Sequence, residues 1–159
     1  MEPYLESVAT VSLVGIGTRT TNADEANPEI ARIPDLYQQF FSQQVGDSIP
    51  ERSDPALLYA VYTNYESDHQ GAYDFLLCQQ GGSTSALPEG LTAVTVPASQ
   101  YLVFEASGEM PQTVVVTWQT IWGYFDDSIP YRRLYTVDFE RYDQTQSNQV
   151  KIYIAVEPR

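Results

Sequence analysis

The sequence predicts an α+β protein in which two βαββ units form one antiparallel sheet, with both helices on one face and a central ligand cleft. The first observation is a repeat: the tetrapeptide Asp-Ser-Ile-Pro occurs at residues 47–50 and again at 127–130. In both places an aromatic segment with helical spacing precedes the tetrapeptide and strand-like segments follow it. A single βαββ unit would leave an unpaired sheet edge and half a core. We therefore expect halves of about 4–80 and 91–157 to pair within a single domain spanning residues 1–159.

The first half is expected to run strand, helix, strand, strand. Its apolar residues alternate loosely at first and then recur at steps of three and four, which indicates a strand followed by a helix. Gly and Pro separate these segments from the strands that follow. The expected boundaries are a strand at 4–20, a helix that starts at Pro28 or Pro34 and runs to about Val45 with Gly46 as its C-cap, strands at 57–66 and 72–78, and a linker at 79–90.

The second half repeats this order. Its first strand, expected at 91–105, is interrupted by Pro97, which indicates an edge or a bulge. A helix is expected at 113–125, because one stripe of it is apolar: Val114, Trp118, Ile121, Trp122 and Phe125. In the strand expected at 133–142, period-two alternation divides the side chains between two faces: Tyr135, Val137 and Phe139 on one, and Thr136, Asp138, Glu140 and Tyr142 on the other.

The charge of the protein disfavours one class of partner. The formal net charge is −13, with only 8 Lys and Arg residues among 159. Nucleic-acid binding depends on clustered basic residues that displace counterions, so direct binding to DNA or RNA is not expected. An acidic field would instead concentrate cationic ligands, although simple solubility explains the same charge.

The single cysteine and the hydropathy of the sequence indicate in which cellular compartment the protein is expected. One cysteine, Cys78, rules out a disulfide within the chain, and its apolar neighbours predict a buried, unreactive thiol. No apolar run reaches about 18 residues, so no transmembrane helix is expected. The N-terminus lacks the pattern of a signal peptide, and the expected location is the cytoplasm.

Residue patterns for catalysis, metals and cofactors are missing from the sequence. The lone His69 lies in a polar segment with no second His or Cys for a metal site, so an exposed loop position is expected. The glycines at 15 and 17 belong to neither a phosphate-binding loop nor a dinucleotide fingerprint. No pair of carboxylates stands out for hydrolysis. We expect no catalytic residue, no metal and no cofactor.

Several motifs taken in order resemble the gyrase-inhibitor-like, AraC-type effector-binding domain family. The resemblance extends from about Leu5 to Val156. It rests on these segments: Val61-Tyr62-x-x-Tyr65-Glu66-Ser67-Asp68, Pro97-Ala98-x-x-Tyr101-x-Val103-Phe104, Trp118-x-x-Ile121 with Phe125, Ser128-Ile129-Pro130 with Arg133, Asp138-Phe139-Glu140-x-Tyr142, and Ile152-Tyr153-Ile154. It implies a duplicated βαββ fold with a pocket between the helices. In multidrug-responsive members, that pocket holds bulky lipophilic cations by a buried glutamate ringed with aromatic side chains.

The resemblance places the family glutamate at Glu140 and a pocket tyrosine at Tyr153. Together with strand parity and helical spacing, this gives the candidate ligand-binding residues Glu140, Tyr153, Tyr142, Trp118, Trp122 and Tyr59. Two alternatives remain open from the pattern alone, because a strand carboxylate is commonly solvated and Trp122 could belong to the core. Asn64 is interpreted as the repeat equivalent of Glu140 in the first half, which implies one site rather than two.

The resemblance leaves several roles open. Regulators of the family carry a DNA-binding segment, which is not expected here, so the chain resembles a stand-alone module of the kind found in integron cassettes. We expect a sensor or sequestering role, with a partner regulator or a homodimer as the possible assembly. Two alternatives are a gyrase-inhibitor-like protein-interaction module and a hydrolase of electrophilic small molecules that uses the same Glu and Tyr side chains.

Overall fold

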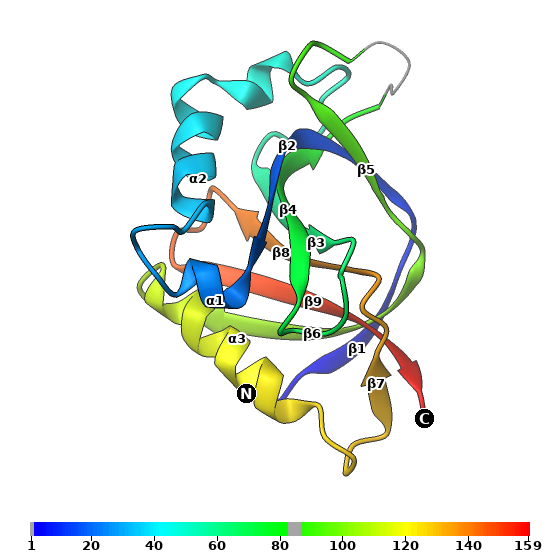
Figure 1. Ribbon diagram of the computed structural model, residues 1–159. Helices are drawn as coiled ribbons and strands as arrows, with labels where there is room; N and C mark the ends of the chain where they lie inside the picture. The colour runs from blue at the N-terminus through cyan, green and yellow to red at the C-terminus, as the bar shows by residue number, and fades with distance from the viewer. Residues whose placement is uncertain (1, 83–86) are drawn as a thin grey trace.

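The computed structural model describes residues 2–82 and 87–159, which form one antiparallel nine-stranded sheet with helices against it (Figure 1). The strands of the first half are β1 (Tyr4–Val8), β2 (Val11–Thr21), β3 (Leu57–Thr63) and β4 (Ala72–Gln80), and those of the second half are β5 (Thr92–Val96), β6 (Ser99–Ser107), β7 (Tyr131–Arg133), β8 (Val137–Asp143) and β9 (Gln149–Pro158). The helices are α1 (Asn22–Glu25), α2 (Ile33–Ser42), the 3₁₀-helix η1 (Val45–Ser48) and α3 (Gln112–Tyr124).

The strand order confirms the duplicated βαββ arrangement. The sheet runs β1-β6-β9-β8-β3-β4-β2-β5, with β7 paired to β9. The halves β2-α2-β3-β4 and β6-α3-β8-β9 therefore follow the same order and meet at a seam where β3 pairs with β8. Each half also receives an outer strand from the other, since β1 pairs with β6 and β5 pairs with β2.

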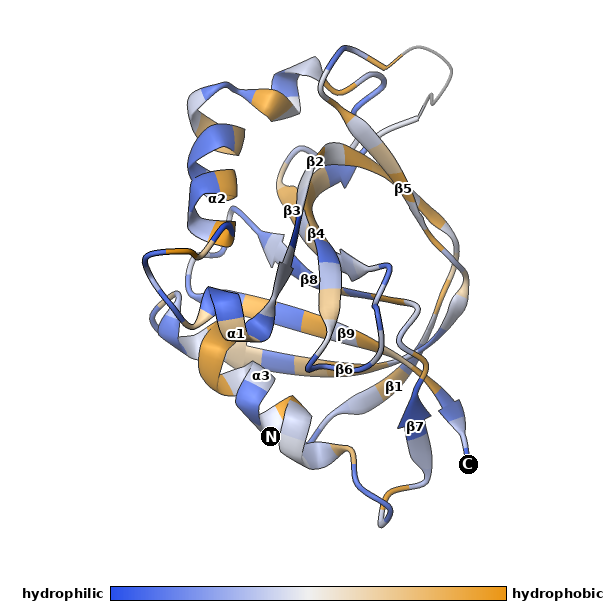
Figure 2. Ribbon diagram, viewed as in Figure 1, coloured by the Kyte–Doolittle hydropathy of each residue, from blue (hydrophilic) through white to orange (hydrophobic). Residues whose placement is uncertain are grey.

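Both longer helices lie on one face of the sheet, as the sequence predicts. Helix α2 buries Leu36 and Phe40 against β2, β3 and β4, and α3 buries Trp118 and Ile121 against β6 and β9. Most apolar residues of α2 lie on its side toward the strands, whereas Phe41 is exposed (Figure 2). Tyr62 and Tyr142 pack against both groups, so the seam of the sheet lies between the two helices.

The opposite face of the sheet is enclosed as the sheet curls. Its core combines side chains from both halves: Leu13, Tyr59, Val61, Leu76, Cys78, Val96, Tyr101, Val103, Val137, Phe139, Tyr153 and Ala155. Cys78 has no exposed surface, and burial raises the pKa of its thiol above the ordinary value, as expected for an unreactive cysteine.

Three predicted strands are each divided in the structure. The segment 4–20 forms β1 and β2, and these pair with different halves of the protein. The segment 91–105 breaks near Pro97 into β5 and β6. The segment 133–142 breaks between β7 and β8, where Tyr135 has a φ of 54°. Left-handed backbone interrupts strand alternation, so the prediction that Tyr135 shares a face with Phe139 is wrong.

The helix ends also differ in detail from the prediction. Helix α2 ends at Ser42, and the left-handed residue after it is Gln44, with a φ of 50°, rather than Gly46. Residues 22–25, which lie between the first predicted strand and the first predicted helix, form the short helix α1. No helix in the described part of the chain is both long and apolar enough to cross a membrane.

Candidate ligand-binding site

Glu140 lies at the centre of the seam between the two halves. It is the middle residue of β8 and pairs with Ala60, the middle residue of β3, on one side and with Ile152 of β9 on the other. Side chains at paired positions point to the same face, so Glu140 points to the helix side of the sheet. Only 3% of Glu140 is exposed. The structure therefore rejects the alternative of a solvated strand carboxylate.

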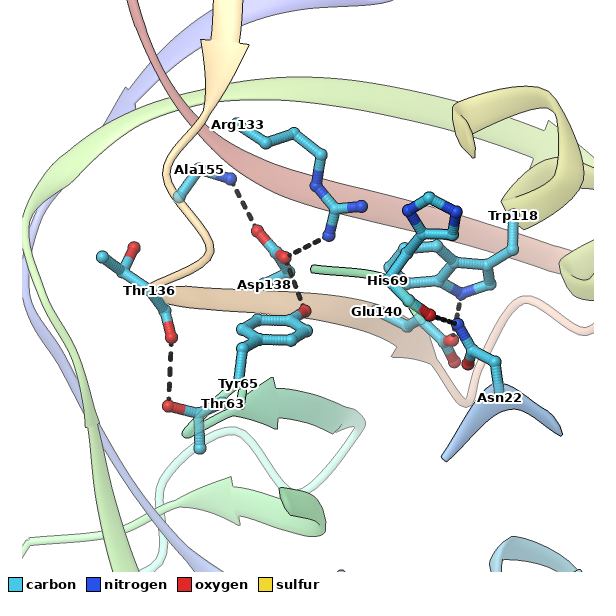
Figure 3. Close-up of polar contacts among 10 residues, drawn as sticks. All are labelled: Asn22, Thr63, Tyr65, His69, Trp118, Arg133, Thr136, Asp138, Glu140 and Ala155. Carbon is cyan, nitrogen blue, oxygen red and sulfur yellow. Dashed lines mark hydrogen bonds and ion pairs between the residues drawn. The ribbon is translucent and has the colours of Figure 1, made fainter. Parts of the chain in front are cut away.

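Three aromatic side chains donate hydrogen bonds to the Glu140 carboxylate. The indole N–H of Trp118 donates to Oε2 at 2.7 Å, and the Tyr62 hydroxyl donates to the same oxygen at 2.6 Å. The Tyr142 hydroxyl donates to Oε1 at 2.5 Å. Figure 3 shows Glu140 beneath the Trp118 indole. Because these donors come from β3, α3 and β8, both halves of the protein hold this carboxylate in place.

Burial changes the pKa values within this group. Burial raises the pKa of Glu140 above its ordinary value of 4.5, and the hydrogen bonds from Tyr142, Tyr62 and Trp118 offset part of that rise. Burial, followed by the charge of Glu140, raises the pKa of Tyr62 well above 10.0. Tyr62 thus stays protonated at neutral pH and remains a donor.

A second buried carboxylate, Asp138, lies two residues before Glu140 on the same face of β8. Its Oδ2 accepts from Arg133 Nη2 at 2.8 Å and from the Tyr65 hydroxyl at 2.6 Å, and its Oδ1 accepts from the Ala155 N–H at 2.8 Å (Figure 3). The side chains of Arg133 and Asp138 are 4% and 0% exposed. Asp138 therefore has a buried cationic partner. Among residues 2–82 and 87–159, no basic side chain forms an ion pair with Glu140.

A cleft of about 450 Å³ opens above this region, between α3, α1 and the loop that joins β3 to β4. Aromatic side chains supply much of its lining: Tyr62, Tyr65, Tyr73, Trp118, Trp122 and the imidazole of His69. Glu25 and Arg133 are the charged residues among those that line it. Glu140 lies behind Tyr62 and Trp118, so the cleft does not reach its carboxylate directly.

The structure brings four of the six predicted site residues to this region, Glu140 among them. Trp118 and Tyr142 contact Glu140 as described. Trp122 lines the cleft, is 37% exposed, and stacks on His69 at a ring separation of 6.1 Å. Trp122 is therefore a surface residue of the cleft and not part of the core.

Tyr153 and Tyr59 do not belong to this site, contrary to the sequence-based prediction. Tyr153 pairs with Phe139 and stacks on it at 4.4 Å, while Tyr59 packs against Phe139 at 5.7 Å. Phe139 lies on the face opposite Glu140, so both tyrosines belong to the enclosed core. Asn64 is likewise not the structural equivalent of Glu140, since it follows the end of β3 at Thr63 whereas Glu140 is the middle residue of β8.

Several residues of the cleft are not identified by the sequence pattern. Tyr62 belongs to one of the family motifs and shares strand parity with Ala60, which pairs with Glu140. His69 was expected to be exposed, yet it is half-buried against Trp122. Glu25 had no sequence signal at all. Tyr62 could be identified only by knowing which strands are neighbours and in which register. The positions of Glu25 and His69 depend on how α1 and the loop between β3 and β4 lie around the cleft.

The donor set in this region does not suit a metal. Among the described residues no group of three or more His, Cys, Asp or Glu side chains lies close enough to hold an ion. The arrangement instead offers a buried carboxylate, aromatic faces and a cleft, which are features suited to an organic molecule.

Comparison with known proteins places the chain in a family. The sequence pattern of Cass2, integron-associated effector binding protein, matches residues 5–156. The chain belongs to the Cass2 family. YobU of Bacillus subtilis (strain 168), whose name describes it as a candidate transcriptional regulator, is 33% identical over 147 residues, which is 89% of each chain.

Solved structures agree with Cass2 family membership. An integron cassette protein from the mobile metagenome of Vibrio cholerae is 36% identical, with a TM-score of 0.81 over 98% of this chain and 96% of that one. SAV2435, solved with bound tetraphenylphosphonium, is 20% identical, with a TM-score of 0.78 over 99% and 94%. EcmrR, solved in a complex with DNA, is 13% identical, with a TM-score of 0.63, and the match spans 58% of that longer chain. The last two matches show a common fold.

Proposed function

We propose that this protein binds lipophilic organic cations at the cleft and that Glu140 is the residue that holds their charge. One observation carries the proposal. Two buried carboxylates lie on the same face of β8, and Asp138 has the buried guanidinium of Arg133 as its partner whereas Glu140 has only neutral donors. Burying a charge without a counter-charge is costly, so such a group is a candidate for function rather than for stability.

A cation would supply the charge that Glu140 lacks. Aromatic faces around the cleft would add cation–π attraction of about 0.5–2 kcal/mol each, the larger values applying where water is excluded. Trp122 offers one such face in the open cleft, and Trp118 and Tyr62 offer others beside the carboxylate. Lipophilic cations suit this setting, because they lose less hydration on entering a site than small inorganic cations do.

Access to Glu140 requires movement of its aromatic donors. Tyr62 and Trp118 lie between the cleft and the carboxylate, with ring centroids 4.9 Å apart. We expect these two rings to separate when a cation binds, and their hydrogen bonds to Glu140 to be replaced by direct contact with the ligand. SAV2435 supports the ligand class, since a protein of the same fold has been solved with tetraphenylphosphonium.

The biological role that we propose is effector sensing or sequestration. YobU and EcmrR support a link to transcription, one through its name and the other through its complex with DNA. The net charge of −13 disfavours DNA contact by this chain itself. A regulatory outcome would therefore pass through a partner regulator.

The test is calorimetric titration of tetraphenylphosphonium into the wild-type protein and Glu140→Gln. This substitution keeps the shape of the side chain and removes its charge. Affinity is expected to fall roughly ten- to a hundredfold, or about 1.5–3 kcal/mol. Glu89→Gln, at an exposed position outside the cleft, removes the same charge and should bind like the wild type. Equal affinities of Glu140→Gln and Glu89→Gln would refute the proposal.

A further inference from the structure

The cleft contains a carboxylate other than Glu140. Glu25, the last residue of α1, lines the cleft directly and is half-buried there. It is the only Asp or Glu among the lining residues that the structure describes. A cation entering from solvent would therefore meet Glu25 while Glu140 is still covered by Tyr62 and Trp118.

The Glu25 carboxylate is held in a fixed position. Its Oε2 accepts from the Thr20 hydroxyl at 2.6 Å and from the Arg32 N–H at 2.9 Å, and its Oε1 accepts from the Ile33 N–H at 3.0 Å. These contacts join the end of β2 to the start of α2. They fix the charge at the mouth of the cleft, and since a carboxylate offers about four acceptor sites, they leave room for a further contact.

Tyr73 lines the same cleft and is held by a short chain of hydrogen bonds. The Tyr73 hydroxyl donates to Asn22 Oδ1 at 3.0 Å, and the amide of Asn22 donates to the carbonyl of His69 at 2.7 Å. Burial, followed by the charges of Glu25 and Glu140, raises the pKa of Tyr73 above its ordinary value. Tyr73 and Glu25 line the same cleft, whereas Glu140 does not line it.

We propose that Glu25 is a second cation-binding residue, which captures a lipophilic cation at the mouth of the cleft and stays beside it once Glu140 is reached. The inference rests on the proposed function and names Glu25 as the residue that the cation contacts first. Capture by a fixed charge accelerates association and depends on ionic strength. The exposed Trp122, which shares the cleft with Glu25, gives the incoming cation an aromatic surface.

The experiment measures association of tetraphenylphosphonium by stopped-flow tryptophan fluorescence. At low ionic strength, Glu25→Gln should lower the association rate constant on the order of three- to tenfold, with a matching loss of affinity. Glu29→Gln removes the same charge from the neighbouring exposed segment, which does not line the cleft, and should behave as wild type. At about 1 M salt, where the screening length is about 3 Å, the defect of Glu25→Gln should largely disappear.

Because Glu25 also caps α2, a second set of variants leaves its hydrogen bonds in place. Ala26 lines the cleft and is exposed, so Ala26→Glu should raise the association rate and Ala26→Lys should lower it. Ala26→Glu should also restore association to Glu25→Gln. A defect of Glu25→Gln that persists at high salt and is not restored by Ala26→Glu would overturn the inference, since Glu25 would then act only by holding α2.

The proposed function and this inference fail in different ways. If tetraphenylphosphonium binds the wild type and Glu140→Gln weakens it, but Glu25→Gln and Glu29→Gln associate at equal rates, only the inference is overturned. If the wild-type protein binds no lipophilic cation, both are overturned.

Discussion

Two carboxylates two residues apart on β8 show how the surroundings of a residue decide its role. Asp138 accepts from a guanidinium, a phenol and a backbone N–H, so its charge is balanced within the fold. Glu140 accepts only from neutral aromatic donors. Strand periodicity puts both on one face, but the sequence does not reveal which of the two carboxylates is paired with a basic side chain of the protein.

The raised pKa of Glu140 gives a prediction about stability and pH. A carboxyl group with a native pKa above its unfolded value of 4.5 binds more protons in the folded state, so its contribution to stability falls as pH rises through that interval. Glu140→Gln removes this dependence. The unfolding free energy of the wild type, relative to that of Glu140→Gln, should therefore increase as the pH is lowered from 8 to 5. Urea denaturation at each pH measures this difference.

The same protonation discharges the residue that we propose to bind the cation. Affinity for tetraphenylphosphonium should accordingly decline over the pH range in which the wild type gains stability. A stability difference between wild type and Glu140→Gln that is constant with pH would contradict a raised native pKa.

At the scale of elements, Asp138 stabilises the interruption between β7 and β8 through a hydrogen bond to the backbone of β9. Strand β9 pairs with β8 from Lys151 to Tyr153 and with β7 from Val156 onward, which leaves Ile154 and Ala155 between the two ladders. The Ala155 N–H donates to Asp138 and its carbonyl accepts from the Leu134 N–H at 3.0 Å. The backbone groups that the ladders leave free are thus satisfied by a side chain and by the linking segment.

Asp138→Asn should therefore destabilise the protein by about 3 kcal/mol or more, because it leaves the buried Arg133 without a counter-charge. Combining it with Arg133→Met, which removes the unpaired charge, should recover much of the loss. Urea denaturation measures both variants. Glu140→Gln is the matched comparison, and a loss of stability as large as that of Asp138→Asn would mean that Glu140 is structural as well.

Features of the fold and the site that depend on short segments of the sequence could be predicted, and features that depend on contacts between distant segments could not. Local patterns were sufficient for α3, for the burial of Cys78 and for Trp118, since helical spacing and apolar neighbours are contained in short segments. Tyr153 and Tyr59 were misplaced because their face depends on the register between strands from different halves. The break at Tyr135 was missed because nothing nearby in the sequence, such as a glycine, marks a left-handed residue.

At the scale of the molecule, both halves contribute to the proposed site, and we expect both halves to unfold together. Tyr62 of the first half and Trp118 of the second hold the same carboxylate, while β1 and β5 each pair with the opposite half. We expect a single cooperative transition.

Both tryptophans, Trp118 and Trp122, lie in the second half, whereas circular dichroism reports on the whole sheet. Urea transitions followed by the two signals should coincide. A fluorescence transition displaced from that of circular dichroism would show that the halves unfold separately.

The pairing of Ala60 with Glu140 bears on how a duplicated protein comes to have one charged site. The two are the central residues of β3 and β8, so they face each other across the axis that relates the halves. Two identical chains arranged this way would place the same residue on both sides of the axis. A glutamate there would meet its own copy, and mutual repulsion would keep one of the two protonated. Fusion into one chain removes that restriction, because each side can change alone. With a methyl group opposite the carboxylate, Glu140 is free of an acidic neighbour across the axis.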